Sequence, residues 1–245
     1  MARSAGAWEG VMKMFFAREK ETKQLIASLS SGRNVILSGM YGIGRTSLVR
    51  HVSRLMQGKR EFLFADFSNT PDRVCRELDN RLTRETIYKK KAAPVRYKSR
   101  RHRLAATVSK GAGQHVLVLD NIAKLTAQKL NLIRYWVSES SFQFVAITET
   151  FLGEDELLAL RLALLPADVM RIGRLPMKDS MEMIRARAEG RKPSPTEQEL
   201  KALALAARGY PLGIVELMST PAMGGRSKRH AALRGAAVDK GKSDD

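Results

Sequence analysis

The sequence predicts an α/β fold: a P-loop parallel sheet covered by helices on both faces, followed by a small all-helical lid subdomain. Two observations carry this prediction. Short apolar runs typical of buried parallel strands alternate with helical segments from residue 34 to about residue 172. After Met177 the apolar periodicity is helical only. We therefore expect a sheet domain first and a helical unit after it.

Five strands are expected, each a short apolar run bounded by turn residues. They lie at residues 34–38, 62–67, 115–120, 142–148 and 169–172. The helices between them follow from a spacing of three or four residues between apolar positions. They are expected at residues 19–29, from the glycine-rich turn to about residue 56, from Thr70-Pro71 through Leu82, and at 125–137.

In the helical unit, helices are expected at residues 180–188 and 212–218, with a third between them. Ser194-Pro195-Thr196-Glu197 has the pattern of a capping box and is expected to begin that third helix, which runs to Arg208. The expected organisation is an N-terminal segment (1–15), an α/β domain (16–176) with a basic insertion (84–110), a helical lid subdomain (177–219) and a basic, disordered tail (220–245).

The composition narrows the classes of partner. A formal charge of +18 and a pI near 10.4 favour polyanions, and nucleic acid first among them, although a generally basic set of proteins in the source organism would give the same values. A single cysteine, Cys75, excludes an intramolecular disulfide and favours a cytoplasmic protein. No apolar run approaches the roughly 18 residues that cross a bilayer, so no membrane partner is expected.

The segment from Gly39 to Thr46 has the spacing of a phosphate-binding P-loop, with Arg45 in place of the usual lysine. It joins an apolar strand to a helix, where backbone N–H groups can surround a phosphate. Arg45 keeps the positive charge on a larger, planar group, and Thr46 is expected to hold Mg²⁺. The expected nucleotide-binding residues are Gly39, Gly42, Ile43, Gly44, Arg45, Thr46 and Ser47. A glycine-rich turn that binds nothing is the alternative.

Asp120 supplies the second half of the expected site. An acid at the carboxyl end of a strand beside the P-loop strand can accept the water shell of Mg²⁺. An Asx turn made by Asp120-Asn121 is the alternative.

These motifs, taken in order, resemble the AAA+ ATPases, and within them the branch of STAND signalling ATPases and transposon or initiator ATPases. Phe16 to Glu21 is similar to a segment that lies against the adenine, which implies that Arg18 binds the nucleotide, and Ala17 replaces a glycine there. Thr148 matches the sensor 1 position that contacts the γ-phosphate and the attacking water. Gly209-Tyr210-Pro211-Leu212 is similar to the lid signature, whose proline, Pro211, packs against the nucleotide. The resemblance implies ATP and Mg²⁺ as cofactors.

Two departures from the family pattern predict slow hydrolysis. Asn121 stands where the family places its general base, and an amide cannot accept a proton from water. Arg45 is the other departure. Glu149 or Glu154 could replace the base, although each also fits a solvated loop or helix start. In a homo-oligomer, Arg161 is the first candidate for an arginine finger, with Arg171 and Arg174 behind it.

The insertion at 84–110 holds ten lysines and arginines against one acid, with Tyr88 and Tyr97 among them. Such a segment can neutralise phosphates and stack on bases, and a solvated loop is the alternative. The residues expected to bind DNA are Lys89, Lys90, Lys91, Arg96, Lys98, Arg100, Arg101 and Arg103.

The hypothesis that unites these features is an ATP-binding, oligomeric, DNA-binding AAA+ protein, with a helper role such as target selection for a transposase or loading of another factor. A STAND-like switch that contacts protein partners is the alternative, and a P-loop scaffold without nucleotide is a third. DNA binding measured with and without ATP separates them.

Overall fold

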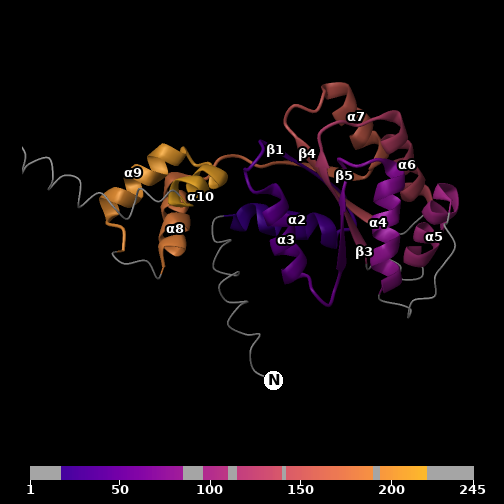
Figure 1. Cartoon of the computed structure of the whole chain (residues 1–245), viewed down its shortest axis with the longest axis horizontal. Helices are drawn as coiled ribbons and strands as arrows, with labels where there is room; N and C mark the ends of the chain where they lie inside the picture. Colours follow the sequence, from indigo (N-terminus) through magenta and orange to yellow (C-terminus); the bar gives the residue numbers. More distant parts are fainter. Residues whose placement is uncertain (1–17, 85–95, 110–114, 140–141, 190–193, 220–245) are drawn as a thin grey trace, which may run out of the picture. The chain divides into compact units, whose positions relative to one another are not determined.

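The computed structural model describes residues 18–84, 96–109, 115–139, 142–189 and 194–219 (Figure 1). They belong to two compact units that divide between Gly173 and Arg174. We expected the division three residues later, after residue 176. The N-terminal segment 1–15 and the tail 220–245 lie outside the described residues.

Among its described residues, the first unit contains one sheet of five parallel strands, in the order β2-β3-β4-β1-β5. The strands are β1 (Asn34–Gly39), β2 (Glu61–Asp66), β3 (His115–Ile122), β4 (Gln143–Glu149) and β5 (Ala167–Arg171). Every residue of β1 is buried, as expected for a strand that has neighbours on both sides and helices on both faces. The predicted α/β fold is confirmed, and each strand lies within two residues of its predicted limits.

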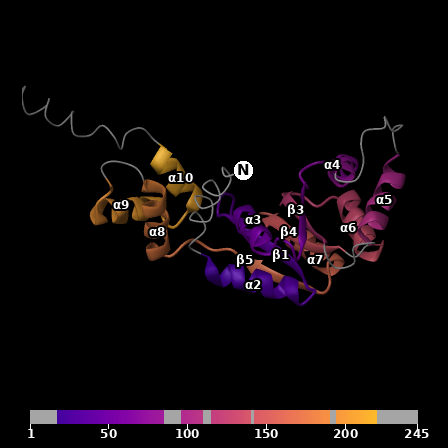
Figure 2. The same cartoon turned by 90° about the horizontal axis from the view of Figure 1, so that it is seen from below.

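Helices cover both faces of this sheet (Figures 1 and 2). On one face lie α2 (Glu19–Ser30) and α3 (Arg45–Leu55), which contact each other and β1. On the other lie α4 (Pro71–Arg84), α5 (Tyr97–Ser109), α6 (Ala127–Glu139) and α7 (Glu154–Ala163). Alternate residues of β2 show the division, because Leu63 and Ala65 pack against the α4–α7 side while Phe64 lies under the guanidinium of Arg50 on α3.

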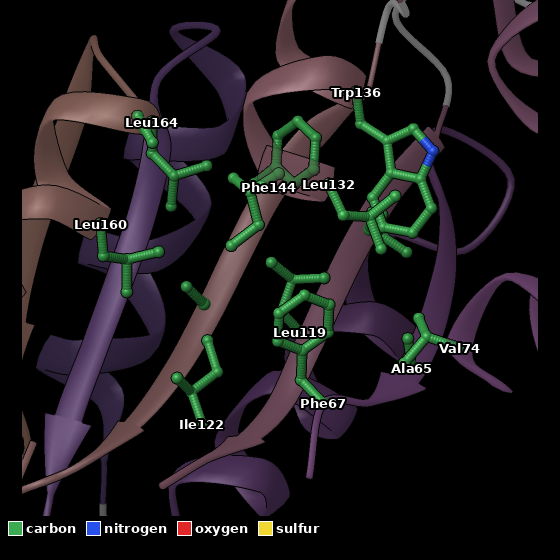
Figure 3. Packing of buried hydrophobic residues seen from close by; sticks show 14 of the residues in the cluster. Ala65, Phe67, Val74, Leu119, Ile122, Leu132, Trp136, Phe144, Leu160 and Leu164 are labelled. Carbon is green, nitrogen blue, oxygen red and sulfur yellow. The ribbon is translucent and has the colours of Figure 1, made fainter. Parts of the chain in front are cut away.

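The main hydrophobic core lies between the sheet and α4–α7 (Figure 3). Trp136 of α6 and Phe144 of β4 are fully buried there, and Phe142 meets both rings edge-on, with centroids 6.3 Å and 6.0 Å away. Burying one large apolar side chain contributes about 1.5–3 kcal/mol. This core holds β3 and β4, the strands that carry Asp120 and Thr148.

The described part of the second unit contains three helices, α8 (Met177–Ala188), α9 (Glu197–Ala207) and α10 (Pro211–Ser219). Ile184, Leu200 and Ile214 are buried in its core, one from each helix. The predicted cap of α9 was wrong by two residues. The hydroxyl of Thr196, not that of Ser194, accepts from the N–H of Glu199, and the Glu199 carboxylate accepts from the N–H of Thr196. Two overlapping Ser/Thr-x-x-Glu patterns compete here, and Pro195 lies outside the helix.

The turn between α9 and α10 requires a glycine. Gly209 has a φ of 71°, and a Cβ placed on it would lie 2.3 Å from the carbonyl oxygen of Leu175. The N–H of Leu175 donates to the carbonyl of Gly209 at 2.8 Å, so the two backbones are in direct contact. Any side chain at Gly209 would push the segment before α8 away.

The predicted basic insertion is partly helical. Within it, Tyr97–Ser109 form α5, which packs against α4 and α6. Lys89, Lys90 and Lys91 lie outside the described residues. Among the described helices, none has the length and apolar character needed to cross a membrane.

Candidate nucleotide-binding site

The P-loop connects β1 to α3 through a turn that depends on glycine. Gly42 and Gly44 have φ angles of 73° and 97°, and Gly44 directly precedes the first residue of α3. A Cβ at Gly39 would lie 3.0 Å from both the carbonyl oxygen of Ile172 and a methyl group of Ile43. The first N–H groups of α3 have no partner within the helix, so they can donate to an anion at this end.

Thr46 and Asp120 meet at the carboxyl edge of the sheet. The Thr46 hydroxyl donates to Oδ1 of Asp120 at 3.0 Å, and the backbone N–H of Asn121 donates to the same oxygen at 2.9 Å. Asp120 is buried. A hydroxyl and a carboxylate at this spacing are the oxygen groups that hold a hydrated Mg²⁺ beside a phosphate chain.

Arg45, the residue in place of the P-loop lysine, crosses from α3 to the end of β4. Its guanidinium donates to the carbonyl oxygen of Thr148 and to Oε1 of Glu149. Only 7% of the Arg45 side chain and 10% of the Glu149 side chain are exposed. The pairing follows from the sheet, because Gly39 and Glu149 are partners in the register of β1 and β4.

Two polar atoms at this edge are buried without a hydrogen-bond partner among the described residues: Oγ1 of Thr148 and Oε2 of Glu149. Such atoms are uncommon, because an unmet buried polar group costs about 1–3 kcal/mol. A phosphate oxygen could accept the Thr148 proton, and a water bound to the phosphate could donate to Glu149. The chemistry of the P-loop, Thr46, Asp120 and these two atoms therefore fits ATP with Mg²⁺.

The Arg18 side chain binds the backbone of the P-loop. One amino group of its buried guanidinium donates to the carbonyl oxygens of Ile43 and Gly173, both at 2.9 Å, and the other donates to Glu21 at 3.0 Å. The resemblance implied that Arg18 binds the nucleotide. In the structure its donors hold the backbone of the P-loop and of the segment after β5.

Asn121 lies beside a second acid, Asp66, at the end of β2. Asn121 has a φ of 61°, and its amide donates to Oδ1 of Asp66 at 3.3 Å. Burial raises the pKa of Asp66, but hydrogen bonds from Ser68 and Asn121 and the charge of Arg73 outweigh it and hold this pKa below its ordinary value. Sequence reasoning missed Asp66, although its place at the end of a strand beside β3 was a usable signal.

The remaining residues predicted for this site are exposed or belong to the second unit. Ser47 is exposed on α3, Glu154 is exposed in the first turn of α7, and Arg161 is exposed near the end of that helix. Arg171 is exposed on β5. Arg174 and Pro211 belong to the second unit, and Pro211 is the first residue of α10.

The arginines of α5 largely pair with side chains of the neighbouring helices. Arg100 donates to Asp72 at 2.7 Å and lies near Asp79, and Arg103 pairs with Asp79 as well. The Arg101 guanidinium lies 3.7 Å from the ring centroid of Tyr135 on α6. Arg96 and Lys98 are exposed. Three of the residues expected to bind DNA therefore fasten α5 to α4 and α6.

Comparison with known proteins gives a consistent family and fold. A sequence model described as an AAA domain matches residues 28–154, from the end of α2 to the start of α7. No curated protein matches the sequence.

Two solved structures show the same fold. Cdc6p from Pyrobaculum aerophilum has a TM-score of 0.64 at 16% identity, with 86% of this chain and 62% of that chain covered. The RuvB Holliday junction branch migration motor of Thermotoga maritima has a TM-score of 0.51 at 17% identity, with 82% and 61% covered. The chain thus spans less than two thirds of either protein.

Proposed function

The chain belongs to the AAA domain family, and on that premise we propose that it binds ATP with Mg²⁺ at its P-loop and uses nucleotide occupancy to control an oligomeric, DNA-bound form. The observation that carries the first part is the 3.0 Å bond between Asp120 and Thr46, the residue next in the chain to the buried Arg45. It brings the phosphate loop and the acid of β3 together at one point.

In this proposal each residue has a defined task. The N–H groups of the P-loop and the start of α3 bind the β- and γ-phosphates, and Arg45 turns toward them. Thr46 and Asp120 hold Mg²⁺, which neutralises charge on the phosphate oxygens. Thr148 donates its unpartnered hydroxyl to the γ-phosphate or to a water beside it. Arg18 keeps the loop in place through Ile43.

Slow turnover is part of the proposal. Asn121 carries no proton acceptor, and Arg45 must leave the Glu149 carboxylate before it can bind phosphate. Binding energy alone then shifts the protein between states, because a ligand stabilises the form that binds it best. An arginine such as Arg161, exposed on α7, would complete the site of a neighbouring copy.

DNA is the proposed partner because of the charge of +18 and because RuvB, a protein of similar fold, is a Holliday junction motor. Arg96, directly before α5, and Lys98 on α5 are the exposed described residues proposed to contact phosphates, together with Lys89, Lys90 and Lys91. A helper role in target selection for a transposase, or in loading another factor on DNA, is the finer form of this proposal.

One observation favours a second candidate, a STAND-like nucleotide switch that contacts protein. Arg100, Arg101 and Arg103 are engaged with Asp72, Asp79 and Tyr135, so part of the basic run serves the packing of α5. In that case the partner would be a protein and the remaining charge would be incidental.

The experiment that tests the proposal measures binding of a labelled DNA duplex with no nucleotide, ADP or ATP, over a series of salt concentrations. We expect ATP to tighten binding and to increase the size of the complex in sedimentation. We also expect log K to fall with log salt by about 0.9 for each phosphate contact. ATP binding without any DNA binding would favour the protein-switch candidate.

A further inference from the structure

The Glu149 carboxylate accepts a hydrogen bond from Arg45, the arginine at the lysine position of the P-loop. It lies one residue beyond Thr148 at the end of β4, opposite Gly39 in the register. Oε1 accepts from Arg45, and Oε2 is buried without a partner among the described residues. This half-satisfied carboxylate lies where the P-loop meets the neighbouring strand.

We propose that Glu149 is the proton acceptor for ATP hydrolysis in this chain, and that Arg45 blocks it until a γ-phosphate draws the guanidinium away. The inference rests on the proposed binding of ATP at the P-loop. It assigns to β4 a task that the amide of Asn121 on β3 cannot perform.

Charge explains why the Arg45 guanidinium would leave Glu149 for a phosphate. The Arg45 guanidinium binds Oε1 of Glu149 and the carbonyl of Thr148, and both contacts compete with phosphate for the same donors. A triphosphate offers several anionic oxygens together with Mg²⁺ and the N–H groups of α3, so it outcompetes one carboxylate.

Release of Arg45 leaves Glu149 buried and without its cation. A buried carboxylate in that state is stabilised by a water molecule that donates to it, or by a proton. The adjacent Thr148 hydroxyl, also without a partner among the described residues, can hold the same water. Glu149 and Thr148 thus form a water site next to the terminal phosphate.

The chemical step balances without a further reactant. The water oxygen forms a bond to the γ-phosphorus while one of its protons passes to the Glu149 carboxylate. The bond between the γ-phosphorus and the bridging oxygen breaks, and its electron pair stays on ADP. The proton then moves from Glu149 to the released phosphate, which restores the carboxylate for its pair with Arg45.

The other acids near this edge are less suited to the task. Asp120 accepts from Thr46 and from the N–H of Asn121. Asp66 is exposed, and its Oδ1 accepts from the Ser68 N–H at 3.1 Å and the Ser68 hydroxyl at 2.7 Å. Glu154 is exposed in the first turn of α7. Of these four acids, Glu149 is the one that contacts the P-loop arginine.

The test compares Glu149→Gln, Glu149→Asp and Asp66→Asn with the parent protein, and uses Asp155→Asn on the exposed start of α7 as a matched control. Affinity for a fluorescent ATP analogue and phosphate release under saturating ATP are measured on each. Glu149→Gln keeps a hydrogen-bond acceptor for Arg45, and a thermal melt without nucleotide checks that each variant is folded.

We expect Glu149→Gln to bind ATP about tenfold tighter, because one charge-assisted competitor for Arg45 is gone. We expect its phosphate release to fall about 100-fold. Glu149→Asp should retain part of the turnover, Asp155→Asn should match the parent, and Asp66→Asn should lower phosphate release far less than Glu149→Gln does. A residue with only a structural role would not tighten binding and slow turnover together.

Three results would overturn the inference while leaving ATP binding intact: parental turnover in Glu149→Gln, loss of turnover in Asp66→Asn instead, or no phosphate release by the parent protein over buffer. Failure of the parent to bind ATP at all would instead overturn the proposed function.

Discussion

The hydroxyl of Thr46 donates to Oδ1 of Asp120 at 3.0 Å, so the first turn of α3 is bonded to the end of β3. β4 lies between β1 and β3 in the sheet, and the bond therefore passes across the end of β4. Thr148 and Glu149 occupy that end. A phosphate chain at the P-loop would thus have the two expected Mg²⁺ residues and the two unpartnered atoms of β4 at the same edge.

Thr46→Ala is expected to weaken ATP binding at least tenfold when Mg²⁺ is present and much less when it is chelated, because the hydroxyl acts through the metal. Titration of a fluorescent ATP analogue with Mg²⁺ or with chelator measures this difference. Ser53→Ala is the matched control, since Ser53 is half-buried on the same helix and its hydroxyl donates to the carbonyl of Arg50. An equal loss of ATP affinity with Mg²⁺ and with chelator would show that Thr46 does not act through the metal.

Arg45→Ala is expected to weaken ATP binding tenfold or more, because a phosphate-facing cation is lost. It should also lower the free energy of unfolding by about 3 kcal/mol, because Glu149 is left buried and unpaired. Urea unfolding measures the second effect. Adding Glu149→Gln should restore the stability without restoring the affinity. If the double variant binds ATP like the parent, Arg45 does not contact phosphate.

Arg100→Ala is expected to change the stability of the protein, and Lys98→Ser its binding to DNA. Arg100 is buried between α4 and α5 and pairs with Asp72, so its loss should lower the stability of the protein by about 2 kcal/mol or more. Lys98 is exposed, so its loss should leave stability unchanged and reduce the salt slope of DNA binding by about 0.9. Melting curves and salt titrations test the pair. A Lys98→Ser protein with the parental slope would exclude Lys98 from the DNA contact.

Gly209→Ala is expected to destabilise the second unit by several kcal/mol, because its Cβ would lie 2.3 Å from the backbone oxygen of Leu175. Gly213→Ala, four residues later in α10, is the control. The nearest atom to a Cβ there is 3.7 Å away, and alanine should stabilise the helix by up to about 1 kcal/mol. Equal effects in thermal unfolding would contradict the close approach of the two backbones.

The sheet could be predicted because buried parallel strands are continuous apolar runs whose ends are marked by glycine or acid. β1 and β3 were both found in this way, and Asp120 was recognised at the end of β3. The last two residues of β3 were missed. Asn121 has a left-handed backbone and shifts the register to β4, and an Asp-Asn pair does not distinguish this from an ordinary turn.

The partners of the arginines could not be predicted with the same rules. The basic run contains one acid, whereas the acids that pair with its arginines, Asp72 and Asp79, lie on the preceding helix α4. Likewise, Arg45 and Glu149 are far apart in the sequence, and only the pairing of β1 with β4 brings them together. Side-chain pairing between elements depends on the order of the strands, which local periodicity does not contain.

The measurement that tests the central claim most directly is a calorimetric titration of the full chain with ATP in the presence of Mg²⁺, repeated with Asp120→Asn. We predict saturable binding of one ATP per chain in the parent and at least tenfold weaker binding in Asp120→Asn, whose amide is a poorer ligand for Mg²⁺. No heat of binding in the parent, or equal affinity in both proteins, would contradict a nucleotide site built on Thr46 and Asp120.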